Sequence, residues 1–261
     1  MSKKIIIIGG GLAGLTAGIY GAKANYDVEI YEKNNIVGGE CTGWDRKGYH
    51  IAYMDKTLKM MYENDKDYKV YGMFQAAYGV DCPEDLLKGE IILDCTDIKI
   101  APWMGDRMTI KTYGYEPSFA PENKQILQVL LPLDVLAYDY WMKLYENKDE
   151  YNRKKNELAE ILMKKIEDNY ETYREKMNIL DVWTPVTYKR YCNAYKGYNQ
   201  SFVAGKNTDP KLYPSPYVEN LDNVILFGQW ISPPGGAPGS AITGKFAIQR
   251  ILKKDKRDVN L

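Results

Sequence analysis

The junction between an apolar run and a glycine-rich turn constrains the fold of this chain more than any other feature. Four isoleucines, Ile5–Ile8, lead directly into the letters GGGLAG. β-Branched residues favour a strand, and Gly9, Gly11 and Gly14 follow it with the spacing G-x-G-x-x-G. Gly9 allows a tight turn, Gly11 has no Cβ to hold a diphosphate away, and Gly14 lets a helix pack closely on the strand. The segment therefore predicts strand, turn and helix, with the helix N-terminus facing a phosphate group.

A second apolar strand is expected at Asp27–Tyr31, and an acid, Glu32, follows it directly. A carboxylate at this place accepts hydrogen bonds from the ribose of adenosine. Together the two segments predict an ADP-binding βαβ unit, and a glycine-rich turn without a ligand is the alternative. The candidate cofactor-binding residues here are Gly9, Gly11, Leu12, Ala13 and Gly14 at the diphosphate, Glu32 at the ribose, and the neighbouring Lys33.

Charge and composition narrow the function classes. Lys+Arg and Asp+Glu both number 35, so the net charge is zero and no global field attracts nucleic acid. No stretch is long and apolar enough to cross a bilayer, which leaves peripheral membrane contact and a homo-oligomer open. One histidine cannot build a multi-histidine site, so no metal is expected. The four scattered cysteines favour a reducing, cytoplasmic setting; they are Cys41, Cys82, Cys95 and Cys192.

A second glycine-rich segment lies near the C-terminus. It begins with a strand expected at 224–227, continues through a Pro/Gly-rich turn, and ends in a helix expected at 239–252. This helix offers a second positive dipole end, which suits the negative charge of a reduced flavin. Two such helix starts favour a long dinucleotide, FAD, over NAD. Gly38 and Gly39 are expected to line the approach to the flavin. The residues expected to border its ring are Gly228, Gly236, Gly239 and Ile242.

The order of these segments predicts an α/β fold in two domains. Residues 1–53 and 217–261 are expected to form a discontinuous, Rossmann-like FAD-binding domain with a parallel sheet. Residues 54–216 are expected to form an inserted α+β substrate or cap domain with an antiparallel sheet. A helical segment is expected over 145–177 of this domain. Its expected strands are Glu90–Asp94, 97–101, 108–113 and 125–131.

Three blocks of sequence resemble the phytoene desaturase branch of the FAD-dependent amine oxidase superfamily, which includes carotenoid desaturases and isomerases. They are IIIIGGGLAGLTAG with Glu32, VGGECTGWDRKGYHI, and FGQWISPPGGAPGSAITGKFAIQRI. The resemblance implies bound FAD, hydride transfer, and an apolar polyene or lipid-like small-molecule substrate. The chain departs from that family in two ways. A long stretch is missing between about Ile51 and Ala76, and Glu40 replaces an arginine that often follows the Gly-Gly pair.

These departures leave more than one function open. The leading hypothesis is an FAD-dependent oxidoreductase of this type, with no residue standing out as the catalytic acid or base. Cys41 and Trp44 are expected in the loop that passes near the flavin, and simple packing explains them equally well. The alternative is an internally deleted, FAD-binding relative that is partner-dependent or degenerate and has no independent catalysis. An NAD-dependent dehydrogenase is the least favoured, since it leaves the C-terminal glycine-rich turn without a role.

Overall fold

The computed structural model describes residues 3–52, 72–82, 89–98, 106–134, 136–198, 214–232 and 235–260. The chain forms two compact units, one from Met1–Thr42 with Gln200–Leu261 and the other from Gly43–Asn199. The fold is mixed α/β, with a short parallel start and a five-stranded antiparallel sheet. The predicted fold class is thereby confirmed.

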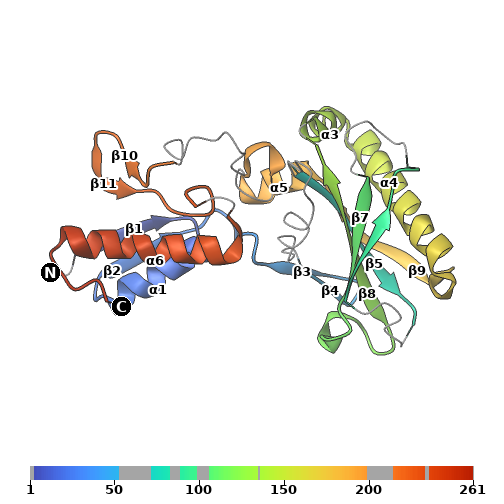
Figure 1. Ribbon diagram of the computed structural model, residues 1–261, viewed down its shortest axis with the longest axis horizontal. Helices are drawn as coiled ribbons and strands as arrows, with labels where there is room; N and C mark the ends of the chain where they lie inside the picture. The colour runs from blue at the N-terminus through green and yellow to red at the C-terminus, as the bar shows by residue number, and fades with distance from the viewer. Residues whose placement is uncertain are drawn as a thin grey trace. The chain divides into compact units, whose positions relative to one another are not determined.

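The first unit combines elements from both ends of the chain (Figure 1). Its elements are β1 (Lys4–Ile8), α1 (Leu12–Lys23), β2 (Asp27–Tyr31), β10 (Tyr217–Val218), β11 (Leu221–Ile225) and α6 (Gly236–Lys254). β1 pairs with β2 in parallel, with Lys4 opposite Asp27 and Ile8 opposite Tyr31. Both strands and the helix between them lie where the sequence places them.

The core of the first unit lies between the β1–β2 sheet and the two helices. Ile7 of β1 is buried together with Ala17 of α1 and Ile248 and Leu252 of α6. α1 and α6 lie side by side (Figure 1), and small residues bring their backbones into contact. Side chains alternate along a strand, so Ile8, one position beyond Ile7, points to the opposite face and is 80% exposed.

The second unit is built around the antiparallel sheet, whose strand order is β6-β7-β8-β5-β9. The sheet strands are β5 (Gly72–Val80), β6 (Glu90–Asp94), β7 (Arg107–Thr112), β8 (Gln125–Leu133) and β9 (Met177–Trp183). A hairpin of β3 (Gly43–Arg46) and β4 (Tyr49–Ala52) accompanies it. The helical elements are η1 (Pro117–Phe119), α3 (Ala137–Tyr145), α4 (Lys148–Asn169), η2 (Glu171–Tyr173), α5 (Pro185–Cys192) and η3 (Tyr195–Gly197).

Both faces of this sheet are covered. α4 lies across one face (Figure 1), where Leu158 and Leu162 pack against a core that includes Phe74 and Leu131. On the other face a second cluster brings Tyr49 and Ile51 of the hairpin together with Trp183 and Tyr188. This packing explains why residues 43–52 belong to the second unit, whereas the sequence analysis assigned them to the first domain.

Three elements differ from their expected bounds. The C-terminal strand is β11, Leu221–Ile225, which pairs antiparallel with the two-residue strand β10. The helix expected over 145–177 is shorter: α4 covers Lys148–Asn169, and residues from Met177 onward form β9, which pairs with β5. The helix α3 lies before the expected stretch, apart from its last residue, Tyr145. Asp97 lies in a turn rather than a strand, and residues 99–101 of that expected strand lie outside the described part of the chain.

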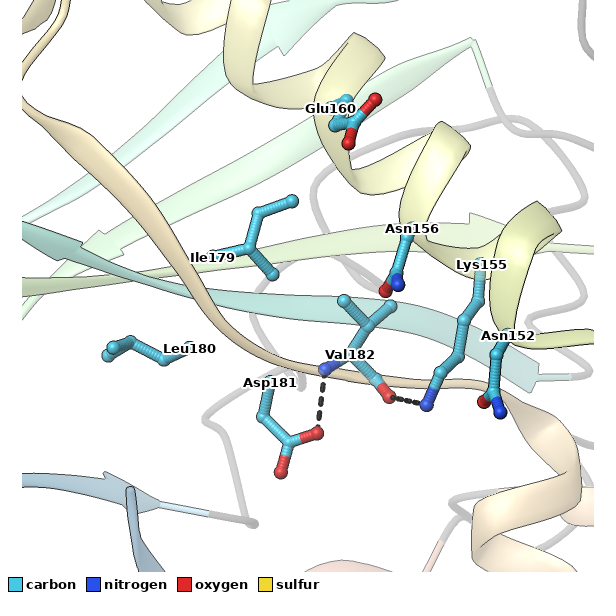
Figure 2. A pocket seen from close by; sticks show the side chains of 8 residues that line it. All are labelled: Asn152, Lys155, Asn156, Glu160, Ile179, Leu180, Asp181 and Val182. Carbon is cyan, nitrogen blue, oxygen red and sulfur yellow. Dashed lines mark hydrogen bonds between the residues drawn. The ribbon is translucent and has the colours of Figure 1, made fainter. Parts of the chain in front are cut away.

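β9 is one of the two edge strands of the described sheet, and side chains occupy both backbone hydrogen-bonding groups of its Val182. Lys155 Nζ donates to the Val182 carbonyl oxygen at 3.2 Å, and the Val182 N–H donates to Asp181 Oδ1 at 2.8 Å (Figure 2). A hollow of about 390 Å³ opens here between α4 and β9. Since exposed edges invite pairing with other chains, these two contacts protect the strand.

No helix within the described residues has the length and apolar character needed to cross a bilayer.

Candidate functional site

The turn between β1 and α1 has the geometry that its glycines predict. Gly9 has φ +105°, a value that favours glycine, and its N–H donates to the Tyr31 carbonyl oxygen at 2.8 Å. Gly11 is the N-cap of α1 and makes no side-chain capping bond. The N–H groups of Leu12, Ala13 and Gly14, in the first turn, therefore have no acceptor within the helix. An anion placed before this helix would meet both these donors and the positive dipole end.

Gly14 fixes how closely α1 approaches the strand. A Cβ at Gly14 would overlap the carbonyl oxygen of Gly9, a backbone atom that cannot move aside. At Gly11, by contrast, the nearest atom to an added Cβ would be the Gly39 Cα, 3.9 Å away. As far as the described residues go, a side chain at Gly11 would therefore fill open space beside the helix N-terminus and would meet no close contact. This space is what a diphosphate requires.

Glu32 directly follows β2 and lies beside the same turn. Its Oε2 accepts a hydrogen bond from the Gly10 N–H at 2.7 Å, and its Oε1 accepts one from the Asn34 N–H at 2.9 Å. Hydrogen bonds from backbone N–H groups lower the pKa of this carboxyl. The Asn34 N–H has the largest effect, and the N–H groups of Gly10 and Lys33 act in the same direction. The Asn34 Nδ2 also donates to Oε1, at 3.0 Å, so donors on both oxygens hold Glu32 as a carboxylate at neutral pH.

The loop that carries Gly38 and Gly39 lies against this turn. The Gly38 N–H donates to the Gly10 carbonyl oxygen at 2.8 Å, and Gly38 forms a parallel bridge with Gly11. A Cβ at Gly39 would lie 3.1 Å from the Gly11 Cα, which is a tight contact. The predicted residues of the N-terminal half are thus brought together around the start of α1.

The four C-terminal candidates gather at the start of α6 in the same unit. The Gly228 N–H donates to Thr243 Oγ1 at 2.9 Å, and the Gly236 N–H approaches Gln229 Oε1 at 3.5 Å. Gly235 caps α6 without a side-chain bond. Ile242 is 49% exposed, and among the described residues a Cβ at Gly239 would meet only the Ser232 carbonyl oxygen, at 3.6 Å.

Two residues of this region were missed as site residues by the sequence analysis. Gln229 forms a side-chain hydrogen bond with Glu40, and burial raises the pKa of Glu40 to about 8. Thr243 holds the turn at Gly228 through its hydroxyl, which also donates to the Ser240 carbonyl oxygen at 2.8 Å. The sequence offered one signal for Gln229, namely that it is a polar residue directly after Gly228.

The remaining candidates have structural partners. The Trp44 indole N–H donates to Asp181 Oδ2 at 2.8 Å, and its ring meets Trp183 edge-on at a centroid distance of 5.2 Å. His50 bonds to Asp45 at 2.8 Å. Burial raises the pKa of the Cys41 thiol, and the negative charge of Glu40 raises it further. Within the described residues, no group of three or more His, Cys, Asp or Glu could hold a metal ion.

Comparison with known families identifies the N-terminal part of the chain. Residues 7–75 match the NAD(P)-binding Rossmann-like domain. This range contains the β1–α1 turn, β2 and the Gly38–Gly39 loop. This part of the chain is therefore similar to an NAD(P)-binding Rossmann-like domain, which suggests a dinucleotide cofactor.

Two relatives are both named 4,4'-diaponeurosporene oxygenase. The protein from Staphylococcus haemolyticus (strain JCSC1435) is 43% identical over 60 residues, which are 23% of this chain and 12% of the relative. The protein from Staphylococcus aureus (strain USA300) is 39% identical over 66 residues, which are 25% of this chain and 13% of the relative. The matches thus span about an eighth of the relatives' length, and the homology is partial and distant.

A solved structure shares the fold over nearly the whole chain. It is an oxidoreductase from Methanosarcina mazei, with a TM-score of 0.55 and 10% sequence identity. The match covers 94% of this chain and 100% of the other. At this identity the likeness concerns the fold alone.

Proposed function

We propose that this chain is an FAD-dependent oxidoreductase of the phytoene desaturase-like type. The observation that carries the proposal is the presence of two uncapped, glycine-started helices, α1 and α6, in one compact unit. The diphosphate of a dinucleotide needs one such helix N-terminus. A second one suits a cofactor whose far end also gains negative charge, as a flavin ring does on reduction.

The residues present fit the cofactor. The N–H groups of Leu12, Ala13 and Gly14 would hold the diphosphate, in the space that the missing Cβ of Gly11 leaves open. Glu32 would accept hydrogen bonds from the ribose, with Lys33 beside it. Gly38 and Gly39 would line the approach. The ring end would be bordered by Gly228, Gly236, Gly239 and Ile242.

Bound FAD would supply hydride transfer, and the protein would supply position and electrostatics. The second unit is proposed as the substrate-type domain. The substrate class proposed is an apolar polyene or lipid-like molecule, supported by the resemblance of the three sequence blocks and by the compound named in the two relatives. The roles proposed for this chain's residues are cofactor binding and substrate orientation, and no residue is assigned as a catalytic acid or base.

One observation favours a second candidate, an FAD-binding chain that depends on a partner for catalysis. Parallel sheets are normally covered on both faces. In the first unit, Ile6 and Ile8, which share a face of β1, are 59% and 80% exposed. The two candidates differ in one respect, because only an independent enzyme would bleach its flavin when an apolar substrate is added.

The test is to titrate the purified chain with FAD, ADP and NADPH and to follow flavin absorbance and fluorescence. We expect about one FAD per chain, and we expect Glu32→Gln to weaken FAD and ADP binding about tenfold, because a charged hydrogen bond is lost. Glu29→Gln, three residues earlier on β2, is the matched control and should leave binding unchanged. A folded chain indifferent to FAD and ADP would refute the proposal, and tighter binding of NADPH would favour a nicotinamide-dependent dehydrogenase.

A further inference from the structure

The carboxylate of Glu32 is occupied by hydrogen-bond donors of the chain itself. Its Oε1 accepts two bonds from Asn34, one from the backbone N–H at 2.9 Å and one from the side-chain Nδ2 at 3.0 Å. Its Oε2 accepts the Gly10 N–H at 2.7 Å. The Lys33 N–H is a further donor to the same carboxyl. A carboxylate offers about four acceptor sites, so these four donors take the sites that ribose hydroxyls would need.

Glu32 is also fixed in place by its packing. A Cβ at Gly10 would lie 3.2 Å from the Glu32 Cβ and 3.3 Å from its Oε2, so the acid lies directly against the glycine-rich turn. The turn is held in addition by the Gly38 loop, because the Gly10 carbonyl oxygen accepts the Gly38 N–H at 2.8 Å. A ribose hydroxyl can therefore bond to Glu32 only where one of the present donors leaves.

One of these four donors belongs to a side chain. The N–H groups of Gly10, Lys33 and Asn34 are part of the backbone, and they cannot leave the carboxylate unless the chain itself moves. The Asn34 carboxamide, by contrast, turns about its own side-chain bonds. Asn34 is half-buried, so water can satisfy the carboxamide once it has turned away. The Asn34 side chain is thus the donor that a ribose displaces at the lowest cost.

We propose that the Asn34 carboxamide is a placeholder for the adenosine ribose, which occupies Glu32 Oε1 until a ribose hydroxyl of the ligand displaces it. This inference rests on the proposed dinucleotide site. The exchange replaces one hydrogen bond to the carboxylate with another and transfers no proton, so Glu32 stays ionised throughout. Because the bond from Asn34 must be broken first, it lowers the affinity for a ligand that brings ribose hydroxyls. A ligand without these hydroxyls leaves the bond in place.

The test compares Asn34→Ala with the wild type by isothermal titration calorimetry. The ligands are ADP and 2′,3′-dideoxy-ADP, which has the same base and diphosphate but no ribose hydroxyl that could displace the amide. Asn34→Ala should lower the Kd for ADP about fivefold, the effect of about one net hydrogen bond, and leave the Kd for dideoxy-ADP unchanged. Asn35→Ala is the matched control, because the neighbouring Asn35 is exposed, and it should leave both Kd values unchanged.

A second measurement follows the Asn34 side chain directly in the wild type. Its amide NMR resonance, assigned by its absence from Asn34→Ala, should move toward the position of a water-exposed amide when ADP is added, and should move less with dideoxy-ADP.

The outcomes separate this inference from the proposed function. Weaker or unchanged ADP binding in Asn34→Ala would overturn the inference alone, since an amide that merely positions Glu32 predicts a loss of affinity. An equal gain in affinity, or an equal NMR shift, for the two nucleotides would also overturn it. Failure of the folded wild type to bind either FAD or ADP would overturn the proposed function together with it.

Discussion

Gly244 of α6 lies so close to α1 that a Cβ at this position would overlap the carbonyl oxygen of Ala13. The same Cβ would lie 3.0 Å from the Ala17 backbone nitrogen. Backbone atoms cannot move aside as a flexible side chain does, so the absence of a side chain at Gly244 sets the distance between the two helices. Since Ala13 is in the first turn of α1 and Gly244 is in the helix whose start forms the other half of the candidate site, this contact also positions both helix starts.

Gly244→Ala should therefore destabilise the chain. Alanine is intrinsically the better helix former, but the overlap forces the helices apart, and overpacking typically costs about 1–3 kcal/mol of unfolding free energy. Urea unfolding followed by circular dichroism measures this loss. Gly239→Ala is the matched control in the same helix, because within the described part of the chain its Cβ would meet only the Ser232 carbonyl oxygen, at an ordinary 3.6 Å. Equal stability of the two variants would contradict the packing argument.

Thr243→Val should weaken the turn before α6. Thr243 is buried, at 5% exposure, and its hydroxyl accepts the Gly228 N–H at 2.9 Å. Valine keeps the shape and leaves that N–H without its acceptor, which costs about 1–3 kcal/mol. We expect a lower urea midpoint and weaker FAD binding, with ADP binding retained because the α1 turn is untouched. Thr243→Ser should restore both, and unchanged stability of Thr243→Val would refute the role of the hydroxyl.

The first unit was predictable because its signals are local. Ile5–Ile8, the glycine spacing and Asp27–Tyr31 specify strand, turn, helix and strand within a short span, and β1, α1 and β2 lie where they predict. Glu32 follows from the same local logic, since the end of β2 places it beside the turn. The contact between Glu40 and Gln229 could not be predicted from the sequence, because the two residues are far apart along the chain and no sequence pattern connects them.

The second unit shows where local signals fail. β5 and β9 were not predicted as strands, and they are strands because they pair with each other and β5 also pairs with β8. The hairpin at 43–52 was assigned to the wrong side of the boundary for a related reason. Its membership depends on the burial of Tyr49 and Ile51 among residues more than 100 positions away, such as Trp183. The periodicity of apolar residues along the sequence does not reveal packing between such distant residues.

Asp181→Ala should destabilise the second unit by about 1–3 kcal/mol, because one carboxylate serves three donors. Its oxygens accept the Trp44 indole N–H at 2.8 Å and the Val182 N–H at 2.8 Å, and they pair with Arg46 Nε at 3.2 Å. Urea unfolding gives the loss, and tryptophan fluorescence should shift to the red as Trp44 becomes hydrated. Asp45→Ala is the control on the same hairpin, since the Asp45 side chain is 80% exposed and contacts His50. A loss as large in that variant would argue against a special role for Asp181.

Asp255→Asn should make the stability of the first unit less sensitive to acid. Asp255 Oδ1 accepts from Lys3 Nζ at 2.7 Å and Oδ2 from the Tyr26 hydroxyl at 2.8 Å, so the end of α6 is tied to the start of the sheet. The hydrogen bond from Lys3, then that from Tyr26, lowers the pKa of Asp255 below its usual 3.8. A carboxyl whose pKa is lowered in the folded state stabilises it above the unfolded pKa and loses that contribution as the pH falls through the folded pKa.

The wild type should therefore be the more stable protein at pH 6, and its advantage over Asp255→Asn should shrink steadily once the pH falls below about 3.8. Thermal unfolding followed by circular dichroism between pH 6 and pH 2 measures the difference. Asp258→Asn removes the same charge from the same exposed C-terminal segment, where Asp258 accepts the nearby Asn260 N–H, and should parallel the wild type. If Asp255→Asn also follows the wild-type curve at every pH, the contact with Lys3 and Tyr26 contributes nothing to folding, and the close packing of α6 on α1 must rest on the apolar core and Gly244 alone.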